Sequence, residues 1–219
     1  ATSGTDSSLT LTGGTYYYST VRAWNVTGLF ATSSSDGVLV DTTPPTSGFV
    51  NDGLGGDLVF QSSTTTLSAN WDSFEDPESG IADYEWAIGT TPGAQDVQTF
   101  LSTAGGTIGT NGTLTLIPGV TYYSTVRATS GVGQTAIATS DGVTIDTTPP
   151  TAGSAFVNDG NGEDLDLQTS NTTLSSNWGG FEDPESAIGG YSWAVGTTPG
   201  GTDVRGFVDV FGATAATDS

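Results

Sequence analysis

Hydrophobic and polar residues alternate along this chain in short runs separated by Gly, Pro, Asn and Asp. The first clear run spans residues 15–23, with Tyr17, Ser19, Val21 and Ala23 on one face and Tyr16, Tyr18, Thr20 and Arg22 on the other. Alternation with a period of two is typical of half-buried β-strands. No segment has helical periodicity. Further strands are expected at residues 31–40, 58–61, 65–71, 81–88, 97–101, 113–116, 120–128 and 135–145, after a turn-rich opening at 50–57 and around a loop at 104–112.

Many short strands with turn signals between them predict an all-β protein built from antiparallel β-sandwiches. One stretch then sets the organisation. Asp36-Gly-Val-Leu-Val-Asp-Thr-Thr-Pro-Pro-Thr46 returns as Asp141-Gly-Val-Thr-Ile-Asp-Thr-Thr-Pro-Pro-Thr151, 105 residues later (141 − 36). A Pro-Pro pair cannot continue a helix or a central strand and keeps the preceding residue extended. Each copy therefore predicts a strand end that runs into a stiff connector between modules.

Other segments repeat with a similar spacing. The loop Phe74-Glu-Asp-Pro-Glu-Ser79 returns unchanged at 181–186, and the strand that begins at Tyr84 returns at Tyr191, both 107 residues later (181 − 74). A fixed internal period indicates a tandem array. The predicted divisions are the C-terminal half of one repeat (1–44), a complete repeat (45–149) and the N-terminal half of the next (150–219).

The two ends of the chain share a phase of this repeat. Residues 1–7 align with residues 213–219, an offset of 212 (213 − 1), which is the sum of the two repeat spacings. We therefore expect the chain to be a window of two periods from a longer tandem polymer.

The net charge of the chain limits the classes of partner that it can bind. The chain has 24 acidic residues and three basic ones, no His and no Cys, and a net charge of −21. Nucleic-acid binding depends on Lys and Arg that neutralise phosphates, so nucleic acid is excluded as a partner, and anionic membrane surfaces are disfavoured. No apolar run approaches the ~18 residues of a membrane span, so no membrane contact is expected within this segment.

The stretch from Leu114 to Ala128 resembles the fibronectin type III family. The family has a Leu, then Pro-Gly, then a strand patterned Tyr-x-x-x-Val-x-Ala, which matches Tyr122, Val126 and Ala128 here. Trp71 matches the family's Trp at the end of the second strand. The resemblance covers the complete repeat and both half repeats, and it implies tandem immunoglobulin-like sandwiches of about 105 residues, as in large secreted and cell-surface proteins. The Val-Asn-Asp-Gly opening and the Phe-Glu-Asp-Pro-Glu-Ser loop depart from the family's pattern, and the fold alone implies no particular function.

Catalysis is not expected. Without Cys, His or Lys, the chain has no thiol nucleophile, serine–histidine pair or Schiff-base amine. Paired carboxylates remain, at Glu75, Asp76 and Glu78, but they recur in every repeat. Duplication of one loop in every module favours a structural role over an active site, and no catalytic or cofactor-binding residue is predicted.

Calcium is the one candidate cofactor. If the loop between the second and third strands lies beside the chain's entry point, acidic residues gather at each joint. The sets are Asp41, Asp52, Asp76 and Glu78 at the first joint, and Asp146, Asp159, Asp183 and Glu185 at the second. Calcium prefers six to eight oxygen ligands in turn-rich sites. The simpler interpretation, which the sequence favours, is that Asp, Asn and Gly are here as turn formers.

Three sequons could carry N-linked glycans, at Asn25, Asn111 and Asn171. Asn111 is expected in a Gly-rich turn that would accommodate a glycan. Outward aromatic residues, Tyr16, Tyr18, Trp24 and Tyr123, could stack on sugars or pack against a neighbouring chain.

The sequence thus favours a self-assembling, non-catalytic repeat unit of a long extracellular fibre or of a cell-surface or flagellar filament, with copies of itself as partners. Two alternatives stay open. One is the stalk of a cell-surface adhesin with calcium-rigidified joints, and the other is a carbohydrate-binding spacer module.

Overall fold

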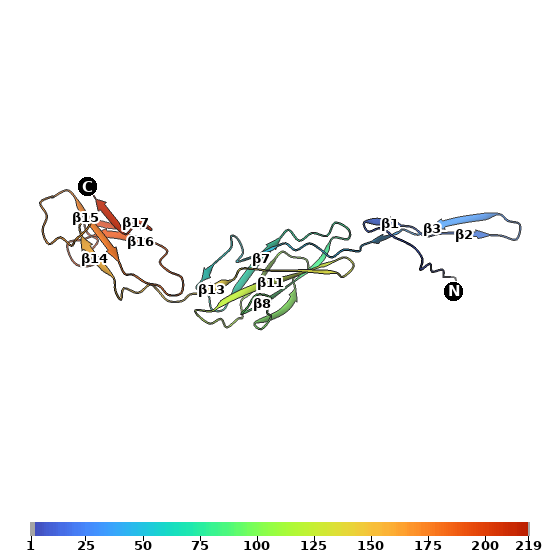
Figure 1. Cartoon of the computed structure of the whole chain (residues 1–219), viewed down its shortest axis with the longest axis horizontal. Helices are drawn as coiled ribbons and strands as arrows, with labels where there is room; N and C mark the ends of the chain where they lie inside the picture. The colour runs from blue at the N-terminus through green and yellow to red at the C-terminus, as the bar shows by residue number, and fades with distance from the viewer. Residues whose placement is uncertain (1–2, 219) are drawn as a thin grey trace. The chain divides into compact units, whose positions relative to one another are not determined.

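The computed structural model describes residues 3–218, which form β-strands and turns with no helix among them (Figure 1). They divide into two compact units, Ala1–Val143 and Thr144–Ser219. Among the described residues, no helix has the length and apolar character that crossing a membrane would require.

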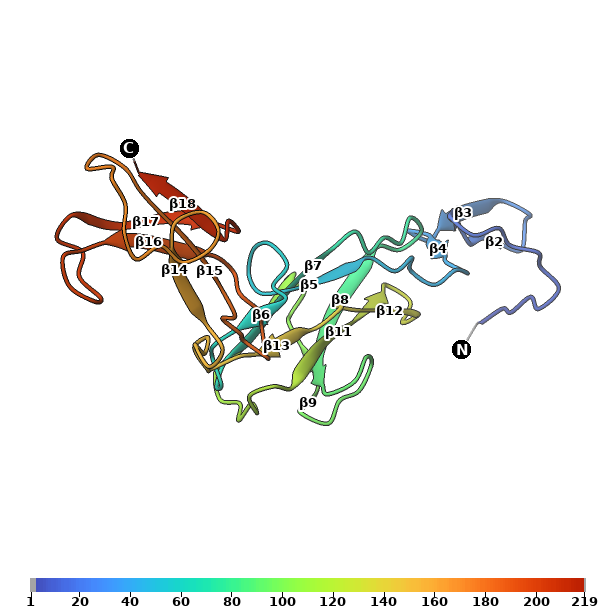
Figure 2. The same ribbon diagram turned by 60° about the vertical axis from the view of Figure 1, so that its left-hand side comes forward.

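The complete repeat is a two-sheet antiparallel sandwich (Figure 2). One sheet has the order β10-β7-β5, and the other has the order β6-β13-β11-β8-β9, with β12 also paired to β11. Strands β5, β7 and β10 thus share one sheet, and the long strands β8 and β11 lie together in the other. This is the arrangement of immunoglobulin-like and fibronectin type III sandwiches, so the predicted fold class is confirmed. The strand bounds are β5 (Phe49–Asp52), β6 (Phe60–Gln61), β7 (Leu67–Asp72), β8 (Ile81–Gly89), β9 (Gln98–Ser102), β10 (Ile108–Asn111), β11 (Thr121–Ser130), β12 (Thr135–Thr139) and β13 (Val143–Ile145).

Strand β11 forms the centre of the larger sheet because its sequence alternates as predicted. Tyr122, Ser124, Val126 and Ala128 point inward and are buried, while Tyr123 and Arg127 point outward. On the neighbouring strand, Val126 lies opposite Trp86 and Ala128 lies opposite Tyr84. The inward side chains of β11 and β8 thus face the same core.

Aromatic rings fill much of this core. Trp71 and Phe74 pack against Tyr84, with ring centroids 6.1 Å and 5.7 Å apart. Each such pair contributes about 0.5–1.5 kcal/mol beyond the area that it buries. Because Phe74 is the first residue of the repeated loop, its burial anchors that loop to the core.

The expected strand at 135–145 is broken at residues 140–142. At Gly142, φ is +99°, and an added Cβ would lie 2.7 Å from the ring of Tyr123. Only glycine fits such a site without strain. The break recurs at Gly37, where φ is +95° and an added Cβ would lie 2.6 Å from the Tyr18 ring, so the repeated Asp-Gly pair encodes it.

Three sequence expectations were wrong in detail. Strand β5 forms inside the turn-rich opening and β10 forms inside the expected loop, because both pair with β7. Gly109 of β10 faces the Trp86 ring closely, with 2.4 Å to an added Cβ, so only a residue without a side chain fits there. Residues 113–116 form no strand, although the N–H groups of Leu114 and Leu116 donate to the carbonyls of Thr65 and Thr64.

The flanking segments carry complementary strand sets. The N-terminal segment has the pairs β1–β4 and β2–β3, which correspond by repeat position to β11, β12 and β13. Unit 2 has the sheets β14-β15-β18 and β16-β17, which correspond to β5-β7-β10 and β8-β9. The bounds are β1 (Thr15–Tyr17), β2 (Thr20–Trp24), β3 (Phe30–Ser34), β4 (Val38–Val40), β14 (Phe156–Asp159), β15 (Leu174–Gly179), β16 (Tyr191–Val195), β17 (Arg205–Phe211) and β18 (Ala215–Asp218).

Because the complete repeat has all its strands and unit 2 does not, the same core substitution should lower the unfolding free energy by different amounts in the two. Leu67 is fully buried, whereas Leu174, at the same position of the repeat, is only half-buried. Leu67→Ala should cost about 2–5 kcal/mol of unfolding free energy because it leaves a cavity, and Leu174→Ala should cost clearly less. A denaturant titration with hydrogen exchange as the readout would give the unfolding free energies of the complete repeat and of unit 2 separately. Equal costs would show that the two sites are packed alike.

Candidate functional site

The repeated connector is bound to the repeated loop. Thr46 N–H donates to the Glu75 carbonyl at 2.8 Å, and the two residues form a β-bridge. Glu78 Oε2 accepts from the N–H groups of Thr42 and Thr43 and from the Thr43 hydroxyl, at 3.0, 3.1 and 2.8 Å. The Thr43 hydroxyl and the Thr42 amide lower the pKa of Glu78, so the carboxylate that receives these bonds is charged at neutral pH. The two segments that repeat most faithfully are therefore the two that bind one another.

The other acidic residues of the first joint complete this network. Asp41 accepts hydrogen bonds from the Ser79 hydroxyl and from the Thr43 amide. Oδ1 of Asp76 accepts from the N–H groups of Glu78 and Ser79, which fixes the turn of the loop. Asp41, Asp76 and Glu78 thus gather at the joint, as the sequence predicts.

The second joint repeats the arrangement within unit 2. Thr151 N–H donates to the Glu182 carbonyl at 2.7 Å, and the Thr148 hydroxyl donates to Glu185 at 2.9 Å. The Ser186 hydroxyl and the Thr148 amide lower the pKa of Asp146. Among the described residues, Asp146, Asp183 and Glu185 form one of two groups in which carboxylate oxygens lie within 4.8 Å of one another. Whether a cation binds there stays a prediction.

Asp52 and Asp159 do not belong to these joint networks. Asp52 ends strand β5, and it groups with Asp57 and Asp141 instead. Its N–H donates to Asp57 Oδ1 at 2.8 Å, and its Oδ2 accepts from the N–H of Gly142 at 3.0 Å. Asp57 and Asp141 were not among the predicted site residues, although both recur in the repeat, as Asp164 and Asp36. That recurrence was the available signal.

Asp52 is charged in an unfavourable place. It has no exposed surface, and burial raises its pKa to about 6, against the opposing effects of the Ser140 and Ser124 hydroxyls. The carboxylate of Asp57 raises the pKa further. At neutral pH the carboxylate is nevertheless mostly ionised.

The three sequons differ in how open they are. Asn25 is exposed, and its Oδ1 accepts from Thr27 and Leu29. Asn171 is also exposed. Asn111 ends strand β10 instead of lying in a turn, and its Nδ2, the atom that a glycan would occupy, donates to Gln98 at 2.9 Å. Glycosylation stays a prediction at all three, and Asn111 is the least open.

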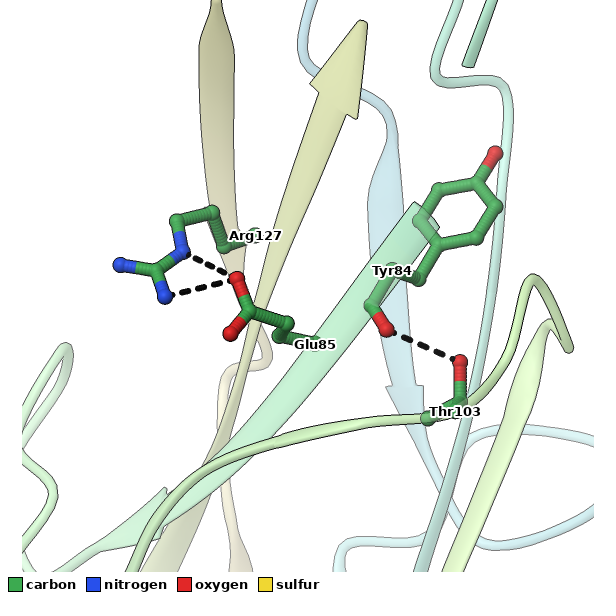
Figure 3. Close-up of polar contacts among 4 residues, drawn as sticks. All are labelled: Tyr84, Glu85, Thr103 and Arg127. Atoms are coloured by element: carbon green, nitrogen blue, oxygen red, sulfur yellow. Dashed lines mark hydrogen bonds and ion pairs between the residues drawn. The ribbon is translucent and has the colours of Figure 1, made fainter. Parts of the chain in front are cut away.

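Each arginine lies over an aromatic ring. Arg127 lies 4.3 Å from the centroid of Phe100 and also pairs with Glu85 at 2.6 Å (Figure 3). In the same view, the Thr103 hydroxyl donates to the Tyr84 carbonyl and ties the chain after β9 to β8. In the N-terminal segment, Arg22 lies 4.4 Å from the centroid of Phe30. These contacts cover outward faces of the sheets, on which Trp24 and Phe30 remain largely exposed.

Unit 2 carries an apolar cavity of about 300 Å³. The lining includes Trp178, Tyr191 and Trp193, whose counterparts in the complete repeat are Trp71, Tyr84 and Trp86. Those counterparts belong to the aromatic core of the complete repeat. The cavity thus lies at positions that are core positions in the complete repeat.

No protein-family model matches this chain, and no curated protein matches it. Among solved structures, a crystal structure of the FN1–FN3 domains of chicken CNTN1 is similar at 16% identity and a TM-score of 0.35. The similarity covers 90% of this chain and 65% of that one, so the chain spans about two thirds of that structure's length. The fold is therefore assigned from the strand order itself.

The joint network predicts the effect of Glu78→Ala. Loss of the acceptor should speed amide hydrogen exchange at Thr42 and Thr43 several-fold, with little effect on β7 and β8. Because the pKa of Glu78 is lowered in the folded state, its contribution is present above its ordinary pKa and is lost as the pH falls through the lowered value. Glu75→Ala is the control, since the carbonyl of Glu75 makes the bond to Thr46. Unchanged exchange in Glu78→Ala would contradict the assignment.

The raised pKa of Asp52 predicts a pH dependence in chelator-treated protein. An acid with a higher pKa in the folded state stabilises the fold below its unfolded pKa, and this stability is lost as the pH rises through about 6. A shift of about two units corresponds to about 3 kcal/mol. Asp52→Asn should therefore flatten the decline in unfolding free energy between pH 4.5 and 7.5, whereas Asp72→Asn should leave it unchanged. An identical decline in Asp52→Asn would exclude Asp52 as its origin.

Proposed function

We propose that this chain is a structural, non-catalytic repeat unit of a long extracellular fibre or cell-surface filament, in which successive repeats complete one another's sandwiches. The observation that carries this proposal is the exposure of core positions in the two flanking segments. Each segment carries a set of strands that the other lacks.

Equivalent residues make the comparison quantitative. Val21 and Val38 of the N-terminal segment are 68% and 62% exposed, whereas Val126 and Val143, at the same repeat positions, are 0% and 1% exposed. In unit 2, Val157 is 63% exposed, whereas its counterpart Val50 is 7% exposed. The same residue types are therefore core in one repeat and surface in the next.

Burial of these apolar faces would supply the driving force for association between chains. Removing apolar surface from water stabilises an association by about 25 cal/mol per Å², and large exposed apolar patches mark interaction sites. The strands that would cover unit 2 have the sequence pattern of β11 to β13, which the N-terminal segment repeats. A second copy of this chain is thus a suitable partner, because its N-terminal segment has both the strand pattern and the apolar residues of β11 to β13.

The acidic loop supports a structural role. The carboxylate of Glu78 accepts main-chain hydrogen bonds from the connector, and that of Asp76 accepts them from its own loop. The acidic composition suits an extracellular or cell-surface location, including a flagellar appendage. The outward aromatic residues of the N-terminal segment, Trp24 and Phe30, offer a second surface for lateral contacts between chains.

Two alternatives use the same features differently. An adhesin stalk would use the same joints, with successive repeats arranged along a single rod. A carbohydrate-binding spacer could use the aromatic cavity of unit 2, but that cavity coincides with core positions of the complete repeat. Completion by another repeat would account for the exposed apolar faces and for the cavity of unit 2.

The test is the association of the 219-residue chain, measured by sedimentation velocity over a range of concentrations. Linear oligomers should form, and Val21→Asp or Val157→Asp should each weaken association at least tenfold because each places a charge on one of the two faces. Val132→Asp makes the same change at an exposed position of the complete repeat and should leave association unchanged. A chain that stays monomeric favours the stalk, and measurable glycan affinity in a monomer favours the spacer.

A further inference from the structure

Three carboxylates converge inside the complete repeat. Asp52 comes from the end of β5, Asp57 from the loop that follows it, and Asp141 from the break between β12 and β13. One oxygen of each lies within 4.8 Å of the others. Asp57 and Asp141 are exposed, so the group is open to solvent on one side.

Asp52 distinguishes this group from an exposed acidic cluster because its carboxylate is buried. It has no exposed surface, and its Oδ1 accepts no hydrogen bond, while its Oδ2 is held by the Gly142 amide. The buried Ser124 and Ser140 also face Asp52, and their hydroxyls lower its pKa. A buried carboxylate oxygen without a donor is costly unless a cation or proton compensates it.

Within the described residues, arginine does not supply that cation. Arg127 pairs with Glu85, Arg205 pairs with Asp218, and the guanidinium of Arg22 lies over Phe30. The chain has no Lys or His. Positive charge for this group therefore has to come from solution.

We propose that Asp52, Asp57 and Asp141 bind one divalent cation, and that calcium is the cation that fits. All the ligand atoms are oxygens, and the absence of His and Cys disfavours zinc. Calcium–oxygen distances of about 2.3–2.6 Å allow ligand oxygens up to about 5 Å apart, which accommodates the observed spacing. Water completes the coordination from the exposed side.

The site would join the two halves of the sandwich. Asp52 and Asp57 belong to the front half of the repeat and Asp141 belongs to the back half. In unit 2, Asp159 N–H donates to Asp164 Oδ1 at 2.9 Å, which reproduces the Asp52–Asp57 contact, while the counterpart of Asp141 in the N-terminal segment is Asp36. One chain thus holds one whole site and two partial ones, so binding to the monomer is independent of assembly.

The experiment is calorimetric titration of the chelator-treated chain with calcium chloride, under conditions in which the chain is monomeric. We expect one saturable site, and an increase in the Tm of the complete repeat of about 5 °C at saturation. Asp57→Asn and Asp141→Asn should each weaken binding at least tenfold. The Asp57→Asn variant should fold, because the amide oxygen that it introduces can still accept the hydrogen bond from the Asp52 N–H.

Two control variants separate this site from other acidic residues. Asp72→Asn makes the same charge change outside the group, and Asp183→Asn alters the group at the second joint; both should bind as the wild-type chain does. The proposal fails if no saturable binding occurs. It also fails if Asp183→Asn abolishes binding while Asp57→Asn and Asp141→Asn do not.

Discussion

The pairing of strand β11 with strand β8 is the interaction on which the rest of the structure depends. Val126 lies opposite Trp86 and Ser124 lies opposite Ile88, so the two strands present these buried side chains to the same core. The hydrophobic effect favours this contact wherever the two strand sets come together, whether they are close in sequence or far apart. In the flanking segments, the equivalent apolar residues Val21 and Val157 are exposed.

The joint has a different physical basis. The Thr-Thr-Pro-Pro connector has few intrinsic conformations, and the Phe-Glu-Asp-Pro-Glu-Ser loop binds it through main-chain hydrogen bonds. Phe74 fixes the loop to the core, and Glu78 fixes the connector to the loop. Hydrogen bonding to main-chain groups depends on the position of these residues and not on any ligand, which accounts for their return unchanged in the next repeat.

Sequence reasoning was most successful where periodicity was long and regular. The inward set of β11, the repeat spacing and the gathering of Asp41, Asp76 and Glu78 at a joint all follow from the pattern. It failed at β5 and β10, whose Asn, Asp and Gly residues favour turns, because pairing with β7 outweighs their local preference. It also placed Asp52 at the joint, since nothing local to Asp52 indicates that Asp57 and Asp141, 84 residues apart (141 − 57), are its neighbours.

The most direct measurement is electron microscopy of the assembled material, with the helical symmetry determined from the images. Each sandwich spans roughly 35–40 Å if its longest strands have about 10 residues at about 3.3 Å each plus turns. Completion of one repeat by the next predicts a continuous filament with an axial rise on the order of 70–80 Å, which corresponds to two repeats. Isolated flexible rods without lateral order or a fixed rise would contradict the account.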